Sequence, residues 1–215
     1  SRVKAGEKKR LRTHMTKERI GLFGGTFAPP HKGHIHAAET MLECLSPDRL
    51  IIMPTFIPPH KQKMSLDTPE QRLSMCKAAF GTLPRTEISD YEITKGGVSY
   101  TAITLEHLKT DGNEICLLCG SDMFLSLESW YHSADIFAMA DVAVVPRYSD
   151  DMSALEEKMA YYKSKYSSEI FIIGKDPFEM SSTEIREAVK TGKNLEKYLT
   201  DGVIDIIKRE KLYSN

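Results

Sequence analysis

The chain has 215 residues, of which 41% are hydrophobic, so it can bury the core of one sizeable domain. Its 29 lysines and arginines nearly balance its 30 aspartates and glutamates, which excludes binding to nucleic acid or a membrane surface through overall charge. Four cysteines are too few for a secreted disulfide scaffold, and no apolar run approaches the roughly 20 residues of a membrane span. We therefore expect a cytoplasmic protein without a nucleic-acid or membrane partner.

The beginning of the chain differs in composition from the rest. Residues 1–18 are polar and basic with no apolar period, so we expect a tail or tag remnant before a single domain over residues 19–215. Short apolar runs follow, and several are near-continuous in Ile, Leu and Val, as in strands covered on both faces. The expected strands are Ile20–Phe23, Leu50–Met53, Glu87–Ile88, Ile115–Cys119, Val142–Val145 and Ile170–Ile173.

Helix signals lie between these strands. Thr68, Pro69 and Gln71 supply an N-cap, a first-turn proline and a capping-box partner for a helix to about Phe80. Ser99 is expected to cap Tyr100–Leu108, and Ser181 or Ser182 a helix to about Lys190. Strands that alternate with helices predict βαβ units and hence an α/β fold with a doubly wound parallel sheet.

In such sheets, ligands bind beyond the carboxyl ends of the strands. The loops after the first, fourth and sixth expected strands are Gly24–Lys32, Gly120–Asp122 and Gly174–Ser182. Each carries polar residues that an inert turn would not need. The sequence therefore directs the search for chemistry to these three loops.

The first of these loops has the features of a phosphate site. Gly24 and Gly25 let the backbone approach a phosphate, the following helix offers unpaired N–H groups, and Thr26 adds a hydroxyl. His31 and His34 lie three apart, so both rings can donate hydrogen bonds to oxygens that gain charge when a phosphoanhydride breaks. The alternatives are two surface histidines or a zinc site, and no nearby carboxylate or cysteine would complete the latter.

The last loop also suggests an anion site. Ser181, Ser182 and Thr183 place hydroxyls at the start of a helix, and Arg186 lies one turn in, where a guanidinium could reach polyphosphate. A well-capped helix with a surface arginine is an equally good interpretation of this segment alone.

Cys116 and Cys119 form a C-x-x-C pattern within an apolar run. Side chains three apart on a strand point to opposite faces of the sheet, so these two thiols could not bind one metal ion. We expect them to be buried core residues.

The motifs together resemble a known family. Gly-Gly-Thr-Phe-x-Pro-x-His-x-Gly-His at 24–34 and Ser-Ser-Thr-x-Ile-Arg at 181–186 are similar to motifs of the bacterial nicotinate-nucleotide adenylyltransferases, of the H-x-G-H nucleotidyltransferase superfamily. Matching segments occur in order at 58–61, 97–101, 120–123 and 130–131, so the resemblance covers about residues 19–213. It implies a Rossmann-like nucleotidyltransferase fold.

The resemblance also implies a reaction. The adenylyl group of ATP would pass to nicotinate mononucleotide, giving nicotinate adenine dinucleotide and pyrophosphate in NAD biosynthesis. Mg²⁺ would bind with the ATP phosphates, without a metal site built from side chains. The partners would be ATP and nicotinate mononucleotide, and the sequence leaves open whether the protein is a homo-oligomer.

Residue roles follow from the resemblance alone. The residues implied in catalysis are His31, His34 and Arg186. Those implied in ATP binding are Gly24, Gly25, Thr26, Phe27, Gly120, Asp122 and Ser182. Those implied in acceptor binding are Thr101, Trp130, Tyr131 and Lys61, with Trp130 stacking on the pyridine ring unless it is a core anchor.

One residue departs from the family pattern. Ala28 stands where the family usually carries an acidic residue, and an alanine side chain cannot accept hydrogen bonds that order the loop. Two alternatives remain: a sister adenylyltransferase with another acceptor, such as nicotinamide mononucleotide or a pantetheine phosphate, and a nucleotide-binding homologue without turnover, in which Ala28 would be the inactivating change.

Overall fold

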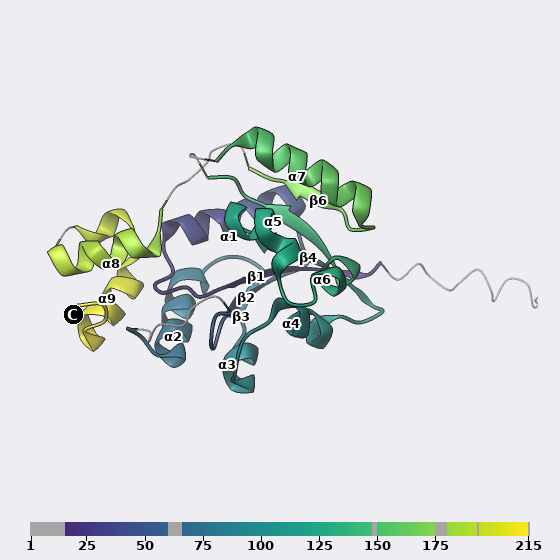
Figure 1. Cartoon of the computed structure of the whole chain (residues 1–215). Helices are drawn as coiled ribbons and strands as arrows, with labels where there is room; N and C mark the ends of the chain where they lie inside the picture. Colours follow the sequence, from purple (N-terminus) through teal and green to yellow (C-terminus); the bar gives the residue numbers. More distant parts are fainter. Residues whose placement is uncertain (1–15, 60–65, 148–149, 175–179, 193, 215) are drawn as a thin grey trace, which may run out of the picture.

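The computed structural model describes residues 16–59, 66–147, 150–174, 180–192 and 194–214 (Figure 1). Its centre is a six-stranded sheet in the order β3-β2-β1-β4-β5-β6, in which each neighbouring pair is parallel. The strands are β1 (Glu18–Gly25), β2 (Arg49–Pro54), β3 (Thr86–Ile88), β4 (Asn113–Cys119), β5 (Ala140–Val144) and β6 (Ile170–Ile172). The predicted strands are all present, with their ends shifted by a residue or two, which is the usual uncertainty of strand and helix ends.

Helices cover both faces of this sheet. They are α1 (Lys32–Leu45), α2 (Pro69–Phe80), α3 (Tyr91–Lys95), α4 (Thr101–Leu108), α5 (Ser121–Ser126), α6 (Ser133–Met139), α7 (Met152–Lys165), α8 (Ser182–Thr191) and α9 (Asp201–Glu210), with short 3-10 helices η1 (Leu127–Ser129) and η2 (Leu195–Lys197). The core on one face takes its side chains from α1, α2, α8 and α9, and the core on the other from α4, α5, α6 and α7. The doubly wound α/β prediction is therefore confirmed.

Two predicted helix starts are confirmed and one is wrong. Thr68 and Gln71 form the expected capping box of α2, and the Ser181 hydroxyl accepts from the Glu184 backbone N–H at 3.1 Å. Ser99 does not cap α4, because its Oγ accepts from the Phe56 backbone N–H at 2.9 Å. The bridge between Ile57 and Val98 holds Ser99 beside this other segment, so a tertiary contact overrides the local capping preference.

The C-x-x-C pair lies in β4 as predicted. Cys116 packs against the core on one face of the sheet and Cys119 belongs to the core on the other. Burial raises the pKa of the Cys116 thiol to about 12, so this cysteine stays protonated at neutral pH. Both thiols are packing residues.

The division into a tail and a domain stays a prediction. Residues 1–15 lie outside the described residues, and Glu18 already belongs to β1. In the part of the chain that is described, no helix combines the length and the apolar composition needed to cross a membrane.

Candidate active site

The candidate site lies where the strand order reverses. β1 pairs with β2 on one side and with β4 on the other. Helix α1, which leads from β1 to β2, packs on one face of the sheet, and α4, which precedes β4, packs on the other. Leu22 of β1 lies beside Leu117 of β4, so Gly24 and Gly120, which follow them, reach the same edge. This is the position at which open parallel sheets bind ligands.

The two histidines form the capping box of α1. His31 is the N-cap residue, and its Nδ1 accepts from the backbone N–H of Gly33 at 3.1 Å and of His34 at 3.3 Å. Nδ1 of His34 accepts in return from the His31 backbone N–H at 3.1 Å. The imidazoles stack with their centroids 3.6 Å apart. A Cβ at Gly33 would lie 3.0 Å from Nδ1 of His31, which explains the glycine between the two histidines.

This arrangement fixes the protonation of both rings. Because Nδ1 accepts hydrogen bonds in each, a neutral imidazole must carry its proton on Nε2. Burial lowers the pKa of His31 to about 4. Burial, and then the neighbouring His31, lower the pKa of His34 well below its usual value of 6.5. At neutral pH each ring is therefore uncharged and has Nε2–H as its donor.

The turn before these histidines is shaped by Phe27. Its backbone is left-handed, with φ 51°, and its ring is 2% exposed in the core. The ring meets Phe23 and His34 edge-on, with centroids 5.3 and 5.0 Å away. Of the four residues assigned to the phosphate turn, Gly24, Gly25 and Thr26 line a cavity, whereas Phe27 can meet a phosphate only through its backbone.

Arg186 of α8 joins the last predicted loop to the first. Its Nη1 donates to the Ala28 carbonyl at 2.5 Å, and its Nη2 donates to Oγ1 of Thr183 at 3.1 Å. The two anion-site patterns therefore lie side by side in space, although 158 residues separate the bonded positions. The hydrogen bond from Arg186 to the Ala28 carbonyl also anchors this turn, and it needs no acidic side chain at position 28.

A cavity of 230 Å³ connects the phosphate turn to the predicted acceptor residues. Its walls include Gly24, Gly25 and Thr26 of the phosphate turn, and Thr101 and Trp130 of the predicted acceptor residues. An adjoining hollow of 290 Å³ shares Pro59, Thr101 and Trp130 and adds Tyr100 and Tyr131, whose rings stack 4.3 Å apart.

Trp130 is anchored in the core and also lines the cavity. The indole is half-buried and packs against the core, so it is anchored, and it also forms part of the cavity wall. Its Nε1 donates to Oγ of Ser126 at 3.4 Å. An aromatic ring fixed in this way can stack on a flat ligand.

The predicted nucleotide contacts in the loop after β4, Gly120 and Asp122, lie at the same edge. Gly120 precedes α5, and a Cβ there would have no neighbour within 4 Å among the described atoms. Asp122 is exposed and accepts from Nη2 of Arg147 at 3.0 Å, and Arg147 also pairs with Asp150 at 3.4 Å. The buried Asp150 thus holds Arg147, and Arg147 in turn holds the exposed Asp122.

Two of the predicted residues lie wholly or partly outside the described residues. Lys61 is one of them. Ser182 is the first residue of α8, and only its side chain lies outside the described part.

Glu92 belongs to the candidate site, although no sequence pattern pointed to it. It is 6% exposed and lines the cavity, and its Oε1 accepts from Oγ1 of Thr104 at 2.7 Å. Oε2 has no hydrogen-bond partner among the described residues. Burial raises the pKa of this carboxyl to about 7, although Thr104, Ser99, Lys95 and Arg72 each oppose that rise. No motif surrounds it, and its burial arises only when α3 packs against α4.

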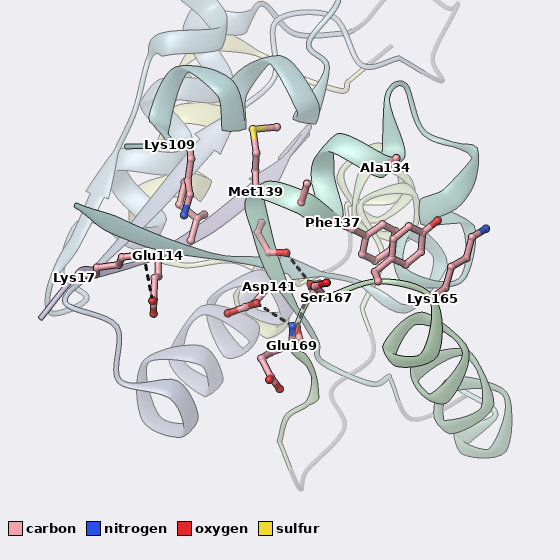
Figure 2. A pocket seen from close by; sticks show the side chains of 15 residues that line it. Lys17, Lys109, Glu114, Ala134, Phe137, Met139, Asp141, Lys165, Ser167 and Glu169 are labelled. Carbon is pink, nitrogen blue, oxygen red and sulfur yellow. Dashed lines mark hydrogen bonds and ion pairs between the residues drawn. The ribbon is translucent and has the colours of Figure 1, made fainter. Parts of the chain in front are cut away.

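A larger hollow, of 750 Å³, lies at the opposite edge of the sheet (Figure 2). Several of its charged side chains engage each other or the backbone. Lys17 pairs with Glu114 at 4.0 Å, and Oδ1 of Asp141 accepts from the Glu169 backbone N–H at 2.9 Å. None of the predicted site residues lines it. Size alone therefore does not identify the functional site.

No metal-binding cluster occurs within the described ranges. Groups of three or more His, Cys, Asp or Glu side chains that could hold an ion are absent there.

Comparison with known proteins gives consistent matches. Residues 22–188 match the family model described as cytidylyltransferase-like. A protein of Clostridium beijerinckii named "Probable nicotinate-nucleotide adenylyltransferase" is 35% identical over 91% of this chain and 99% of its own length. A protein of the same name from Clostridium kluyveri is 36% identical over 89% and 97%. In fold, the chain is similar to the Plasmodium falciparum nicotinic acid mononucleotide adenylyltransferase complexed with APC, with TM-score 0.74, 16% identity and 91% and 97% coverage.

Proposed function

The chain belongs to the nicotinate-nucleotide adenylyltransferases, within the cytidylyltransferase-like family, and we propose that the cavity between its phosphate turn and Trp130 is the active site. The protein is an enzyme that transfers the adenylyl group of ATP to nicotinate mononucleotide. The products are nicotinate adenine dinucleotide and pyrophosphate, in a step of NAD biosynthesis. The observation that carries the site assignment is that one cavity joins Gly24–Thr26 to Thr101 and Trp130.

The reaction needs no proton transfer to begin. A 5′-phosphate oxygen of the acceptor attacks the α-phosphorus of ATP and forms the new P–O bond. The bond between the α-phosphorus and its bridging oxygen breaks, and pyrophosphate leaves with that electron pair. Since the nucleophile is already an anion at neutral pH, the rate depends on alignment and on charge stabilisation.

The donors around the turn are suited to that charge. We assign the Nε2–H groups of His31 and His34 and the guanidinium of Arg186 to the ATP phosphates. Two observations support the assignment of neutral rings: the pKa values of both histidines are lowered, and their Nδ1 atoms accept backbone hydrogen bonds. Their hydrogen bonds can strengthen as the leaving pyrophosphate gains charge.

Other residues hold the nucleotide. The backbone of Gly24, Gly25, Thr26 and Phe27 would approach the phosphates, and Ser182 would add a hydroxyl. Gly120 and Asp122 would contact the nucleoside end, since both lie at the same edge. Mg²⁺ keeps several of its waters and binds through phosphates, so we expect it to enter with ATP.

The acceptor would occupy the opposite side of the cavity. Trp130 would stack on the pyridine ring, and the backbone at Thr101 and Tyr131 would receive the nicotinate carboxylate. Thr101 is the first residue of α4, where the positive end of the helix dipole favours an anion. Lys61 stays a predicted acceptor contact, and a cytoplasmic location stays a prediction.

Pyrophosphate release tests this function against its two alternatives. The purified protein is incubated with ATP, Mg²⁺ and either nicotinate mononucleotide, nicotinamide mononucleotide or a pantetheine phosphate. We expect the highest kcat/KM with nicotinate mononucleotide. Faster turnover of another acceptor would identify a sister enzyme, and no turnover with any acceptor would identify a binding protein.

A further inference from the structure

Arg72 of α2 is the largest fully buried side chain in the described residues, with 2% of its surface exposed. Its guanidinium donates in three directions. Nε donates to Oδ1 of Asp67 at 3.1 Å, Nη1 donates to the Thr26 carbonyl at 2.8 Å, and Nη2 donates to the Phe56 carbonyl at 3.1 Å.

The two carbonyls belong to two different segments that border the cavity. Thr26 lies in the phosphate turn after β1. Phe56 follows β2 and leads directly to Pro58 and Pro59, which line the cavity. The Phe56 backbone N–H also donates to Ser99, just before α4. One guanidinium therefore ties the turn assigned to ATP to the segment that borders the acceptor.

Arg72 is itself held from the C-terminal end of the chain. Its partner Asp67 has a side chain only 1% exposed, and Oδ2 of that carboxylate accepts from the Tyr213 hydroxyl at 2.6 Å. Tyr213 is 2% exposed and follows α9, which packs against α2. A continuous series of hydrogen bonds thus runs from Tyr213 through Asp67 and Arg72 to the carbonyls of Thr26 and Phe56.

Stability alone gives little reason for such an arrangement. A buried ion pair loses its hydration, and apolar residues of similar volume are often as stable or more so. A guanidinium, however, is planar and rigid and presents its donors in a fixed fork. It can therefore hold two backbone segments at one spacing.

We propose that Arg72 is a positioning residue that sets the distance between the ATP phosphates and the acceptor, with Asp67 and Tyr213 holding its guanidinium in place. The inference rests on the proposed function, in which alignment of the attacking oxygen with the α-phosphorus supplies much of the rate. Misplacement of reacting groups by about 1 Å can lower a rate by about 100-fold.

The test compares kcat with KM in two variants. Arg72→Lys keeps the charge but cannot reproduce the three-way fork, so we expect kcat to fall by about 100-fold. Tyr213→Phe keeps the ring and removes only the bond to Asp67, so we expect a fall of about tenfold. In both variants the KM for ATP should stay within about threefold, because the groups that bind ATP are unchanged.

Ser168→Ala is the matched control. Its buried hydroxyl donates to the Ala140 carbonyl at 2.7 Å, at the opposite edge of the sheet, so this variant loses a similar bond without touching the cavity. Its kcat should equal that of the wild type even if its melting temperature falls as much as that of Tyr213→Phe.

The double variant gives a readout that general destabilisation would not mimic. Tyr213 acts through Arg72, so R72K/Y213F should have the kcat of R72K alone rather than the product of both losses. Wild-type kcat in Tyr213→Phe and in a folded Arg72→Lys would overturn the inference while leaving the proposed function intact. Absence of turnover in the wild type would overturn the proposed function and the inference with it.

Discussion

At the scale of single residues, His31 and His34 combine helix capping with the donor groups assigned to the phosphates. The sequence predicted both histidines at one helix start because their spacing is local. It could not show that each Nδ1 is occupied by a backbone N–H, which requires the extended backbone of His31. The two roles can nevertheless be separated by substitution.

His34→Gln should keep the fold and lose the chemistry. A glutamine at this capping-box position can accept from the N-cap backbone, as Gln71 does from Thr68 at 2.8 Å. We expect kcat to fall by about 100-fold to 1000-fold through loss of the Nε2–H donor, with little change in melting temperature. His34→Ala should show the same kinetic loss and a further destabilisation of about 1 kcal/mol.

Both measurements can contradict this division of roles. Unchanged kcat in His34→Gln would remove His34 from the chemistry. A melting temperature equally low in the glutamine and alanine variants would show that capping is not what the imidazole contributes to stability.

At the scale of elements, the sequence predicted helix starts well where the capping partners are close in the chain. Thr68 and Ser181 each bond to a backbone N–H three residues later. Ser99 was misassigned because its partner, Phe56, is 43 residues away, and Arg72 was missed because its partners come from three separate segments and Tyr213 supports it from a fourth. A local sequence pattern cannot show contacts between residues that lie this far apart in the chain.

The capping of α8 should affect ATP binding, because α8 carries Arg186. Ser181→Ala removes the N-cap bond and should cost about 1 kcal/mol of stability. We also expect a several-fold higher KM for ATP, since the first turn of α8 frays and Arg186 loses its fixed place at Ala28.

Asp151→Ala is the matched control for that variant. Asp151 caps α7, which packs on the other face and carries none of the proposed site residues. A similar loss of stability with an unchanged KM for ATP is expected. Equal KM values in both variants would show that α8 capping does not support the site.

At the scale of the whole molecule, the fold could be predicted because four of its strands are buried Ile, Leu, Val and Met runs that identify a sheet covered on both faces. The pKa shifts caused by burial could not be predicted from the sequence, because they depend on which residues pack over each titratable group. Glu92 is the clearest case. Its pKa of about 7 arises from burial between α3 and α4.

Glu92 should make the protein less stable as the pH rises. Its folded-state pKa lies above the unfolded value of 4.5, so the folded state holds the proton more tightly and stability falls between about pH 4.5 and 7. The shift corresponds to about 3 kcal/mol at pH 8. Glu92→Gln cannot ionise, so the free energy of unfolding of the wild type should decline relative to that of the variant across this window. If the free energy of unfolding, measured with denaturant, changed with pH equally in the wild type and in Glu92→Gln, this would contradict the raised pKa.

Isotope tracing from ATP labelled in its α-phosphate tests adenylyl transfer at the cavity between the phosphate turn and Trp130. With nicotinate mononucleotide as acceptor, we expect all transferred label in the dinucleotide, with pyrophosphate unlabelled and formed in equal amount. We also expect His34→Gln to lower this transfer by at least about 100-fold. Label in inorganic phosphate or pyrophosphate, or transfer undiminished in His34→Gln, would contradict adenylyl transfer at this cavity.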